Sequence, residues 1–500
     1  MTAARRVVAV FLGALTLLAL SICPAAGRGH DEESLQGLVT RWASEIGAPG
    51  MAARIVDSDG ARSAAFVGVD GDGHDIDGST PFVWGSVSKQ FAAATARGLK
   101  REGVLDATSP VVEVVPQARR VLSDPAVTVD DLVHHTSGLP HDITVTDEWT
   151  RRGSATDAVT ALDAPKGAGP RGEFRYSSLN YLLLQAVIEQ AAGSSYADAV
   201  RRVVLDPAGS DAITDPQLFV DSVPRGHVPF FGSTRPVDVG VDSAGLGYGY
   251  LAGSIDDLGR YASWRLRERH GGEARYREVP TAQGSTYGDG LFHERIDGHD
   301  VWWHAGAVPG YYTYVSLIPS LDTAIMLAAN RYGEIEADRL AAVGRNLTTS
   351  VTGGRTSELP ESSASTVLGA LAAIIATLVV GIGVHAVRIV SGRTPQRTRG
   401  VAVVRGVVAV GVGTAAAVAV LFGLSATTGA GLSVAGRWAP DVALLVWVLL
   451  VAIAAAAVVD VFGQVVGCRR ADVADGRAAR RSDPVPTAFR SLMPPARRST

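Results

Sequence analysis

Three long apolar stretches near the C-terminus are the feature that most limits what this 500-residue chain can fold into. They cover residues 367–387, 407–424 and 442–459. Each is about as long as a helix that crosses the roughly 30 Å hydrocarbon core of a bilayer. One such stretch could be a buried helix of a soluble domain, but three in succession predict three transmembrane helices within residues 366–467. The lipid bilayer is therefore an expected partner.

Arginine placement predicts which side of the membrane each part occupies. The link between the first two stretches carries five arginines and the tail 468–500 carries eight, whereas the link 425–440 carries Arg437 alone. Because arginine-rich segments beside membrane helices remain in the cytoplasm, both rich segments are predicted to be cytoplasmic. Residues 28–355 then lie outside, and a polar linker at 353–365 joins them to the first span.

The first 27 residues have the three parts of an export signal. Arg5 and Arg6 precede an apolar run over 7–22, which small residues and a proline follow. Such a segment, residues 1–27, is either a signal peptide or a retained anchor. Both alternatives export the residues that follow, in agreement with the arginine placement. The sequence thus predicts a multi-pass protein of the cell membrane with an extracytoplasmic body.

The body, residues 32–352, is long enough to bury a large core without disulfides. It has no cysteine, which excludes a thiolate metal site and a cysteine nucleophile there. At 47% hydrophobic and 19% charged residues, the chain is neither disordered nor a nucleic-acid-coating protein. Strand patterns occur at 51–56, 63–68, 312–317 and 324–329, and helical patterns at 86–102 and 179–192. Strands at both ends of the body predict an α+β fold whose ends share one sheet.

The sequence Ser86-Val87-Ser88-Lys89 stands where an apolar segment meets an alanine-rich helical pattern. Residues three apart share one face of a helix, so Ser86 and Lys89 are expected to point into the same cavity. A desolvated lysine has a lowered pKa and can accept the serine proton. The alternative is an ordinary helix start with a surface lysine. Lysine is scarce, since only three occur in the chain, and this scarcity favours a role for Lys89.

Two further segments carry candidate site residues. Tyr176 stands just before the helical pattern at 179–192, where it could face a cavity, and a nearby cation would favour its phenolate. His304-Ala305-Gly306-Ala307 leads into a strand pattern, and its small residues let a ligand approach the backbone. The alternatives are a packed core tyrosine and a structural histidine.

Metal and cofactor binding are not indicated. The pair His134-His135 is interpreted as part of a structural loop, and the acidic run at 70–78 lacks the glutamate of a calcium loop, so it is interpreted as a turn. No phosphate-binding or dinucleotide fingerprint occurs in the body. We expect no cofactor and no metal.

In this order and spacing the three motifs resemble the serine β-lactamase-like family, which includes class C β-lactamases, D-alanyl-D-alanine carboxypeptidases and related esterases. The resemblance spans about residues 35–350. Further segments that look like family segments are 47–50, 82–91, 103–106, 127–140, 176–193, 251–261 and 287–290. The resemblance implies a β-lactamase/transpeptidase-like body, with an antiparallel sheet flanked by helices and a helical subdomain.

The resemblance also implies roles for site residues. Ser86 corresponds to the acylated nucleophile, Lys89 to the adjacent base and Tyr176 to the catalytic tyrosine of the Tyr-x-Asn motif. His304-Ala305-Gly306 stands in place of Lys-Thr-Gly, and the backbone N–H groups of Ser86 and Ala307 would form the oxyanion hole. Ser178, His304, Gly306 and Ala307 are the expected substrate-binding residues.

Two departures from the family pattern bear on function. Ser178 replaces the usual asparagine, and His304 replaces a fixed cation by a group expected to titrate near neutrality. Both disfavour efficient β-lactam hydrolysis more than acyl transfer itself. The sequence therefore predicts a membrane-anchored extracytoplasmic serine hydrolase of peptide, β-lactam or ester carbonyls. The alternatives are an esterase without peptidase activity and a penicillin-binding-type sensor that is acylated at Ser86 without turnover.

Overall fold

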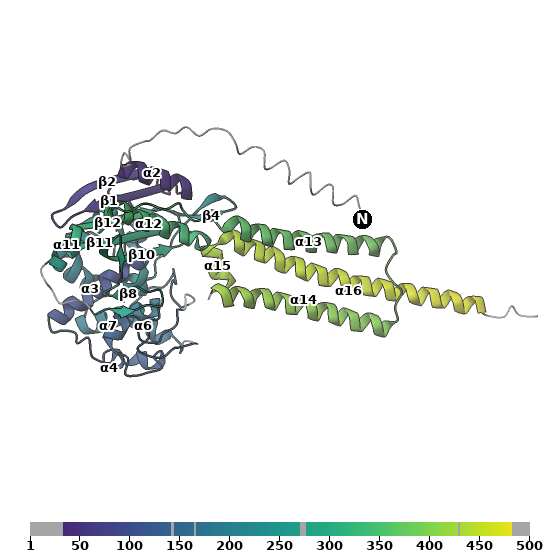
Figure 1. Ribbon diagram of the computed structural model, residues 1–500. Coiled ribbons are helices and arrows are strands. Elements are labelled where there is room, and N and C mark those ends of the chain that lie inside the picture. The colour runs from purple at the N-terminus through teal and green to yellow at the C-terminus, as the bar shows by residue number, and fades with distance from the viewer. Residues whose placement is uncertain (1–33, 142–144, 165–166, 271–276, 429–430, 483–500) are drawn as a thin grey trace, which may run out of the picture.

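The computed structural model describes residues 34–141, 145–164, 167–270, 277–428 and 431–482. It shows a body of mixed helices and strands from which a bundle of three long helices projects (Figure 1). The predicted export signal, residues 1–27, lies outside the described residues, and so does the end of the basic tail.

An eight-stranded antiparallel sheet forms the centre of the body, in the order β2-β1-β12-β11-β10-β9-β8-β7. Its strands are β1 Gly50–Val56, β2 Ala61–Gly68, β7 Val279–Pro280, β8 Thr286–Gly288, β9 Leu291–Ile296, β10 His299–Val308, β11 Tyr311–Ile318 and β12 Thr323–Ala329. Strand β1 pairs with β12, with Met51 opposite Ala329, so the two ends of the body share one sheet. The prediction of an α+β body closed in this way is confirmed.

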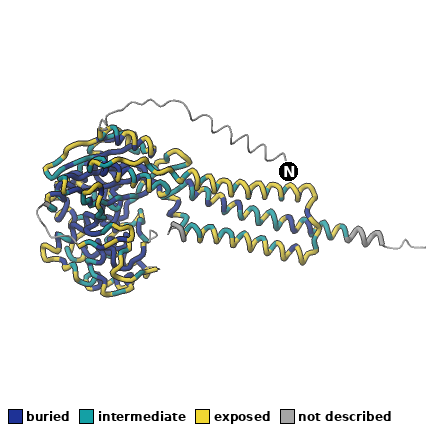
Figure 2. The backbone as a smooth tube through the Cα atoms, in the orientation of Figure 1, coloured by how far each residue is buried: buried dark blue, intermediate teal, exposed yellow. Residues whose placement is uncertain are grey.

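Helices cover both faces of the sheet, which explains why strand β12 is apolar throughout. Its side chains alternate between two hydrophobic clusters, Met326 joining one and Leu327 the other. One face carries α2 Leu35–Ile46 and α12 Ala337–Thr352; the other carries α3 Ser88–Arg101 and α11 Ile255–His270. Figure 2 shows the buried residues gathered in this layered centre of the body.

Short helices packed around α7 Ser178–Ala192 form the subdomain next to α3, and they are α4 Val111–Val114, α5 Val129–Val133, α6 Ala155–Ala161 and α8 Tyr196–Val200. Two more short helices, α9 Asp206–Ala208 and α10 Pro216–Ser222, follow α8 in the chain. Two small antiparallel pairs complete the body: β3 Pro81–Val83 with β6 Ala252–Ser254, and β4 Gly226–Phe230 with β5 Ser233–Val237. The predicted helix at 86–102 begins instead with a single 3-10 turn, η1 Gly85–Val87, and continues as α3.

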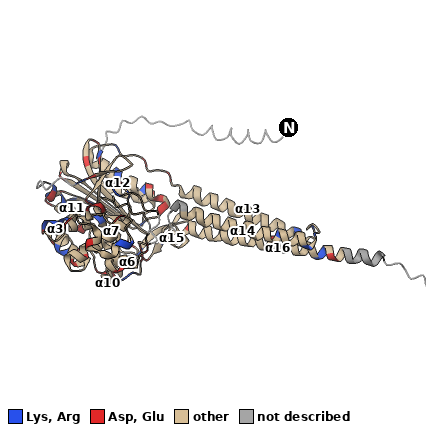
Figure 3. Cartoon of the chain, turned by 90° about the horizontal axis from the view of Figure 1, so that it is seen from below, with Lys and Arg blue, Asp and Glu red and all other residues tan. Residues whose placement is uncertain are grey.

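The projecting bundle consists of α13 Ala364–Val390, α14 Arg399–Thr428 and α16 Pro440–Ser482, with the short helix α15 Leu432–Trp438 between the last two. All three long helices are long and apolar enough to cross a membrane. Their large apolar side chains are mostly exposed, as lipid-facing side chains would be (Figure 2). Charged side chains lie on the body and at the far end of the bundle, and the middle of the bundle lacks them (Figure 3).

Candidate active site

A short turn at the start of α3 presents Ser86. Trp84 anchors this turn by donating its backbone N–H to the carbonyl oxygen of Leu251 at 2.9 Å. Gly85 has a φ of 53°, in the left-handed region, and a Cβ at this position would collide with the backbone nitrogen of Ala307. The glycine therefore lets the turn approach strand β10, so that Ser86 lies beside that strand.

Lys89 lies one helical turn after Ser86 and is fully buried. Its Nζ is 2.9 Å from Ser86 Oγ, 2.8 Å from the carbonyl oxygen of Tyr248 and 3.3 Å from Ser178 Oγ. A neutral amine has two N–H donors and one lone pair. If the carbonyl and the Ser178 hydroxyl take the two donors, the lone pair is left for the Ser86 hydroxyl proton.

Burial also sets the protonation of Lys89. It lowers the pKa of this lysine to about 7, and the carboxylate of Asp147 offsets part of the shift. A substantial fraction of the amine is therefore neutral near pH 7. A neutral amine beside the serine is what Lys89 needs in order to accept the Ser86 proton.

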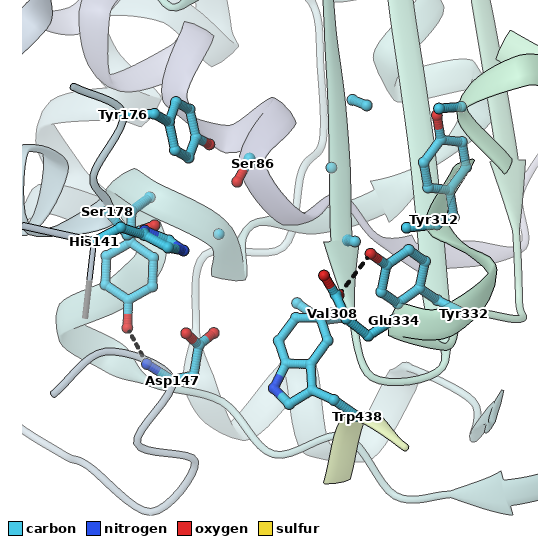
Figure 4. A pocket seen from close by; sticks show the side chains of 17 residues that line it. Ser86, His141, Asp147, Tyr176, Ser178, Val308, Tyr312, Tyr332, Glu334 and Trp438 are labelled. Atoms are coloured by element: carbon cyan, nitrogen blue, oxygen red, sulfur yellow. Dashed lines mark hydrogen bonds between the residues drawn. The ribbon is translucent and has the colours of Figure 1, made fainter. Parts of the chain in front are cut away.

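Tyr176 stands on the other side of Ser86. Its hydroxyl points towards Ser86 (Figure 4), and Lys89 Nζ lies 5.1 Å from the ring centroid. Burial raises the pKa of Tyr176, and it outweighs the influence of the Ser86 hydroxyl, which lowers it. Tyr176 therefore keeps its proton at neutral pH, and the expectation that a nearby cation favours a phenolate is wrong.

Strand β10 brings backbone N–H groups to the same place. Gly306 has no room for a side chain: a Cβ there would collide with the carbonyl oxygen of Trp84 and lie 2.8 Å from the backbone nitrogen of Ser86. The next residue, Ala307, lines the cavity together with Ser86. The backbone N–H groups of Ser86, on the turn, and Ala307, on β10, can together hold a carbonyl oxygen as it gains charge.

The structure corrects the expectation for His304. The side chain is only 2% exposed, packs against the rings of Phe292 and Tyr176 at 5.4 and 6.0 Å, and donates from Nδ1 to the Ala305 carbonyl oxygen at 2.6 Å. Burial, with a smaller effect of the charge on Lys89, lowers the pKa of His304 to about 3. His304 is therefore neutral across the physiological range, not a cation that titrates near neutrality. The cavity wall is formed by Ala305, Gly306 and Ala307 instead.

A cavity of about 290 Å³ opens beside Ser86 (Figure 4). Besides Ser86, Tyr176 and Ser178, its lining includes several residues that the sequence analysis did not identify. They are His141, Asp147, Tyr248, Gly249, Val308, Tyr312, Tyr332, Glu334, Ala337, Ala341 and Trp438. No lysine or arginine belongs to the lining among the residues that the structure describes, whereas two carboxylates do.

Asp147 is the most consequential of the missed residues. It has a φ of 60°, and its carboxylate accepts hydrogen bonds from the hydroxyls of Tyr250 at 2.8 Å and Thr146 at 2.9 Å. Its backbone N–H donates to the hydroxyl of Tyr248 at 2.8 Å. Only the tertiary structure brings these residues together, so a single sequence holds no local pattern that would have identified Asp147.

The pair His134-His135 has structural partners, as expected. The ring nitrogens of His134 lie 2.7 and 2.8 Å from the carbonyl oxygens of Asp130 and Arg277. His135 Nδ1 accepts a hydrogen bond from the side-chain amide of Asn180 at 3.0 Å. Within the described ranges, no group of three or more histidine, cysteine, aspartate or glutamate side chains could hold a metal ion.

The layered body and the serine at the start of a helix beside a sheet strand define a β-lactamase/transpeptidase-like fold. Residues 35–349 match the protein-family model described as Beta-lactamase, and the chain belongs to that family. The resemblance that the sequence motifs indicated is thereby confirmed.

Solved structures with this fold include a penicillin-binding protein homologue from Pyrococcus abyssi, with a TM-score of 0.56, 22% identity and coverage of 66% of this chain and 80% of that one. A D-amino acid amidase from Ochrobactrum anthropi has a TM-score of 0.53 and 21% identity, and the match covers 63% and 96% of the two chains. A class C β-lactamase from Rhodobacter sphaeroides has a TM-score of 0.51 and 19% identity, with coverage of 63% and 97%.

Curated relatives are distant. The Unguisins hydrolase ungD' of Aspergillus campestris is 23% identical over 56% of this chain and 58% of its own length. The 6-aminohexanoate-dimer hydrolase of Paenarthrobacter ureafaciens is 29% identical over 44% of this chain and 57% of its own length. The chain thus spans little more than half the length of either relative.

Proposed function

We propose that this protein is a membrane-anchored serine hydrolase that forms an acyl-enzyme at Ser86 with its active site outside the cytoplasm. The observation that carries the proposal is the buried Lys89 amine, 2.9 Å from Ser86 Oγ and with its pKa lowered to about 7. Family membership and the names of the hydrolases similar to the chain support it.

In the acylation step, neutral Lys89 takes the Ser86 proton as Oγ attacks the substrate carbonyl carbon. The carbonyl oxygen gains negative charge and receives hydrogen bonds from the N–H groups of Ser86 and Ala307. Tyr176, protonated and with its hydroxyl directed at Ser86, passes its proton to the leaving group and regains one from the Lys89 ammonium. The carbon–leaving-group bond breaks, and the acyl group remains on Ser86.

Deacylation uses the same groups in reverse. A water molecule gives a proton to the neutral Lys89–Tyr176 pair and attacks the acyl carbon. Collapse of the intermediate returns the proton to Ser86 Oγ and releases the acid. Ser178 contributes by accepting a hydrogen bond from Lys89, which keeps the amine directed at Ser86.

The charges of the cavity favour one kind of substrate. Asp147 and Glu334 line it, and His304 is neutral. A substrate carboxylate beside the scissile bond, as in a D-alanyl peptide, would meet these two carboxylates, and no lysine or arginine of the described residues belongs to the lining. We infer that amides and esters without that carboxylate are preferred to carboxypeptidase substrates. A relative named 6-aminohexanoate-dimer hydrolase and a fold neighbour named D-amino acid amidase accord with amide substrates.

Serine labelling tests the proposal. The full-length protein in detergent should react with a fluorophosphonate probe, and Ser86→Ala should abolish the reaction, whereas Ser79→Ala, at an exposed turn, should not. Turnover of a p-nitrophenyl ester, an amide and a β-lactam is then compared in the same preparation. Full labelling of Ser86→Ala would refute the nucleophile. Labelling of the wild type without turnover of any substrate would favour the penicillin-binding-type sensor.

A further inference from the structure

We propose that α15, the short helix between the second and third membrane helices, closes one side of the active-site cavity with Trp438, and that Trp438 selects substrates by their apolar group. The inference rests on the proposed function, because it concerns substrates of the same site. It makes the membrane bundle part of the catalytic unit rather than only an anchor.

Trp438 reaches the cavity from α15. Figure 4 shows its ring beside Val308 and Glu334, across the cavity from Tyr176. Its ring meets the ring of Tyr332 edge to face, with centroids 5.8 Å apart, and it packs against the hydrophobic cluster of the body. A residue that lies about 350 positions after the serine in sequence thus belongs to the same cavity lining.

Polar contacts on either side of Trp438 hold the link in place. Arg437 donates to the carbonyl oxygen of Asp147 at 2.9 Å and lies over the ring of Trp149, 5.1 Å from its centroid. The Asp441 carboxylate accepts the backbone N–H of Phe231 at 3.3 Å. Because Arg437 engages the backbone of Asp147, the link also contacts the segment that supplies a carboxylate to the cavity.

The chemistry of this side of the cavity indicates the substrate group that it accepts. Trp438, Tyr332, Tyr312 and Val308 present rings and aliphatic carbon on the side of the cavity opposite Tyr176 (Figure 4). Burial of an apolar group against aromatic rings is favourable, and a small acetyl group gains little from it. We therefore expect acyl substrates that carry an aromatic or bulky aliphatic group. Since α16 begins at Pro440, two residues after Trp438, this group binds next to the membrane end of the body.

Two esters with the same leaving group test the inference in full-length protein in nanodiscs. In Trp438→Ala, kcat/KM for p-nitrophenyl phenylacetate should fall about tenfold, while that for p-nitrophenyl acetate should change less than about twofold. Trp438→Phe should retain most of the preference for phenylacetate. Arg437→Ala should shift the preference in the same direction as Trp438→Ala. Trp447→Ala is the matched control, since Trp447 is an exposed tryptophan on α16 outside the cavity lining.

The inference would be overturned if kcat/KM fell equally for both esters in Trp438→Ala, or fell for neither. It would also be overturned if Trp447→Ala shifted the preference between the esters as much as Trp438→Ala. Labelling rates with an ethyl and a phenylalkyl fluorophosphonate measure the same preference without turnover. If the wild type labels at Ser86 but hydrolyses neither ester, the proposed hydrolysis is refuted. The labelling rates of the two probes then still test whether Trp438 selects the apolar group. A wild type that does not label at all overturns both proposals.

Discussion

Burial, rather than an ion pair, determines the charge of Lys89. If it is the base, kcat/KM should rise with pH through about 7, since the neutral form that accepts the proton dominates above the pKa. Lys89→Arg should lose nearly all activity because a guanidinium keeps its proton. Lys100→Arg, at the exposed end of the same helix, should remain active. Retained activity in Lys89→Arg would contradict the assignment.

A substitution of Asp147 tests the role of Lys89 through its pKa. Its carboxylate raises the pKa of Lys89, so Asp147→Asn should lower that pKa further and move the acidic limb of the kcat/KM profile to lower pH. The amide oxygen can still accept the hydroxyl of Tyr250. The measurement is a pH profile of ester hydrolysis for both proteins. A profile that does not move would show that Asp147 has no electrostatic effect on the base.

The structure leads to a prediction for His304 that is opposite to the one made from the sequence, which expected its side chain to titrate near neutrality. Because its pKa is lowered to about 3, its charge does not change between about pH 5 and 8. The pH dependence of KM for an anionic ester, compared with a matched neutral ester, should therefore be the same in His304→Gln as in the wild type, because Lys89 is left to titrate in both proteins. A rise of KM with pH that is confined to the anionic ester and disappears in His304→Gln would show that the imidazole titrates in contact with substrate.

These residues show what a single sequence can and cannot predict about the site. Ser86 and Lys89 are three apart on one helix, so their juxtaposition follows from local geometry and the Ser-x-x-Lys spacing predicts it. The low pKa of His304 depends on rings that β9 and the turn before α7 supply, and no spacing records that. Asp147 reaches the cavity from a loop, and Trp438 reaches it from the short helix α15. At neither place does a periodic sequence pattern reveal which way a side chain points.

At the level of elements, the site depends on the close approach of turn η1 to strand β10. Gly306→Ala should force them apart, because the added Cβ collides with the Trp84 carbonyl oxygen. If N–H groups of this junction form the oxyanion hole, kcat should fall about 100-fold. Overpacking should lower the free energy of unfolding by about 1–3 kcal/mol. Ester kinetics and thermal unfolding measure the two effects.

Gly369→Ala on α13 is the control for this substitution, because no atom lies within 4 Å of a Cβ there. It should leave both quantities unchanged. If Gly306→Ala retains full kcat, backbone alignment at this junction does not stabilise the transition state.

The strands and long helices were predictable because their patterns are local and strong. The sequence of strand β12 is a short apolar run because the strand is buried on both faces, and the sequences of the three C-terminal helices are long apolar stretches. Their ends were less predictable. Helix α16 continues to Ser482, beyond the apolar run and into the basic tail, because helical hydrogen bonding does not require apolar side chains.

At the scale of the whole molecule, two independent observations agree on how body and membrane are related. The contacts of α15 with the body place both on the same side of any membrane that the bundle crosses. The arginines then predict which side: the link between α13 and α14 and the start of the tail, both at the far end of the bundle, are basic, and the link that carries α15 has Arg437 alone (Figure 3). An extracytoplasmic body satisfies both observations.

Cysteine labelling of intact cells tests that orientation. In a Cys23→Ser, Cys468→Ser background, Ser433→Cys, exposed on α15, should react with an impermeant maleimide, and Ser391→Cys, in the link between α13 and α14, should react only after the cells are permeabilised. The reason is that the bilayer separates the two positions, which lie at opposite ends of the bundle. The reverse pattern would place Ser86 in the cytoplasm. Reaction of both cysteines in intact cells would show that α14 does not cross the membrane.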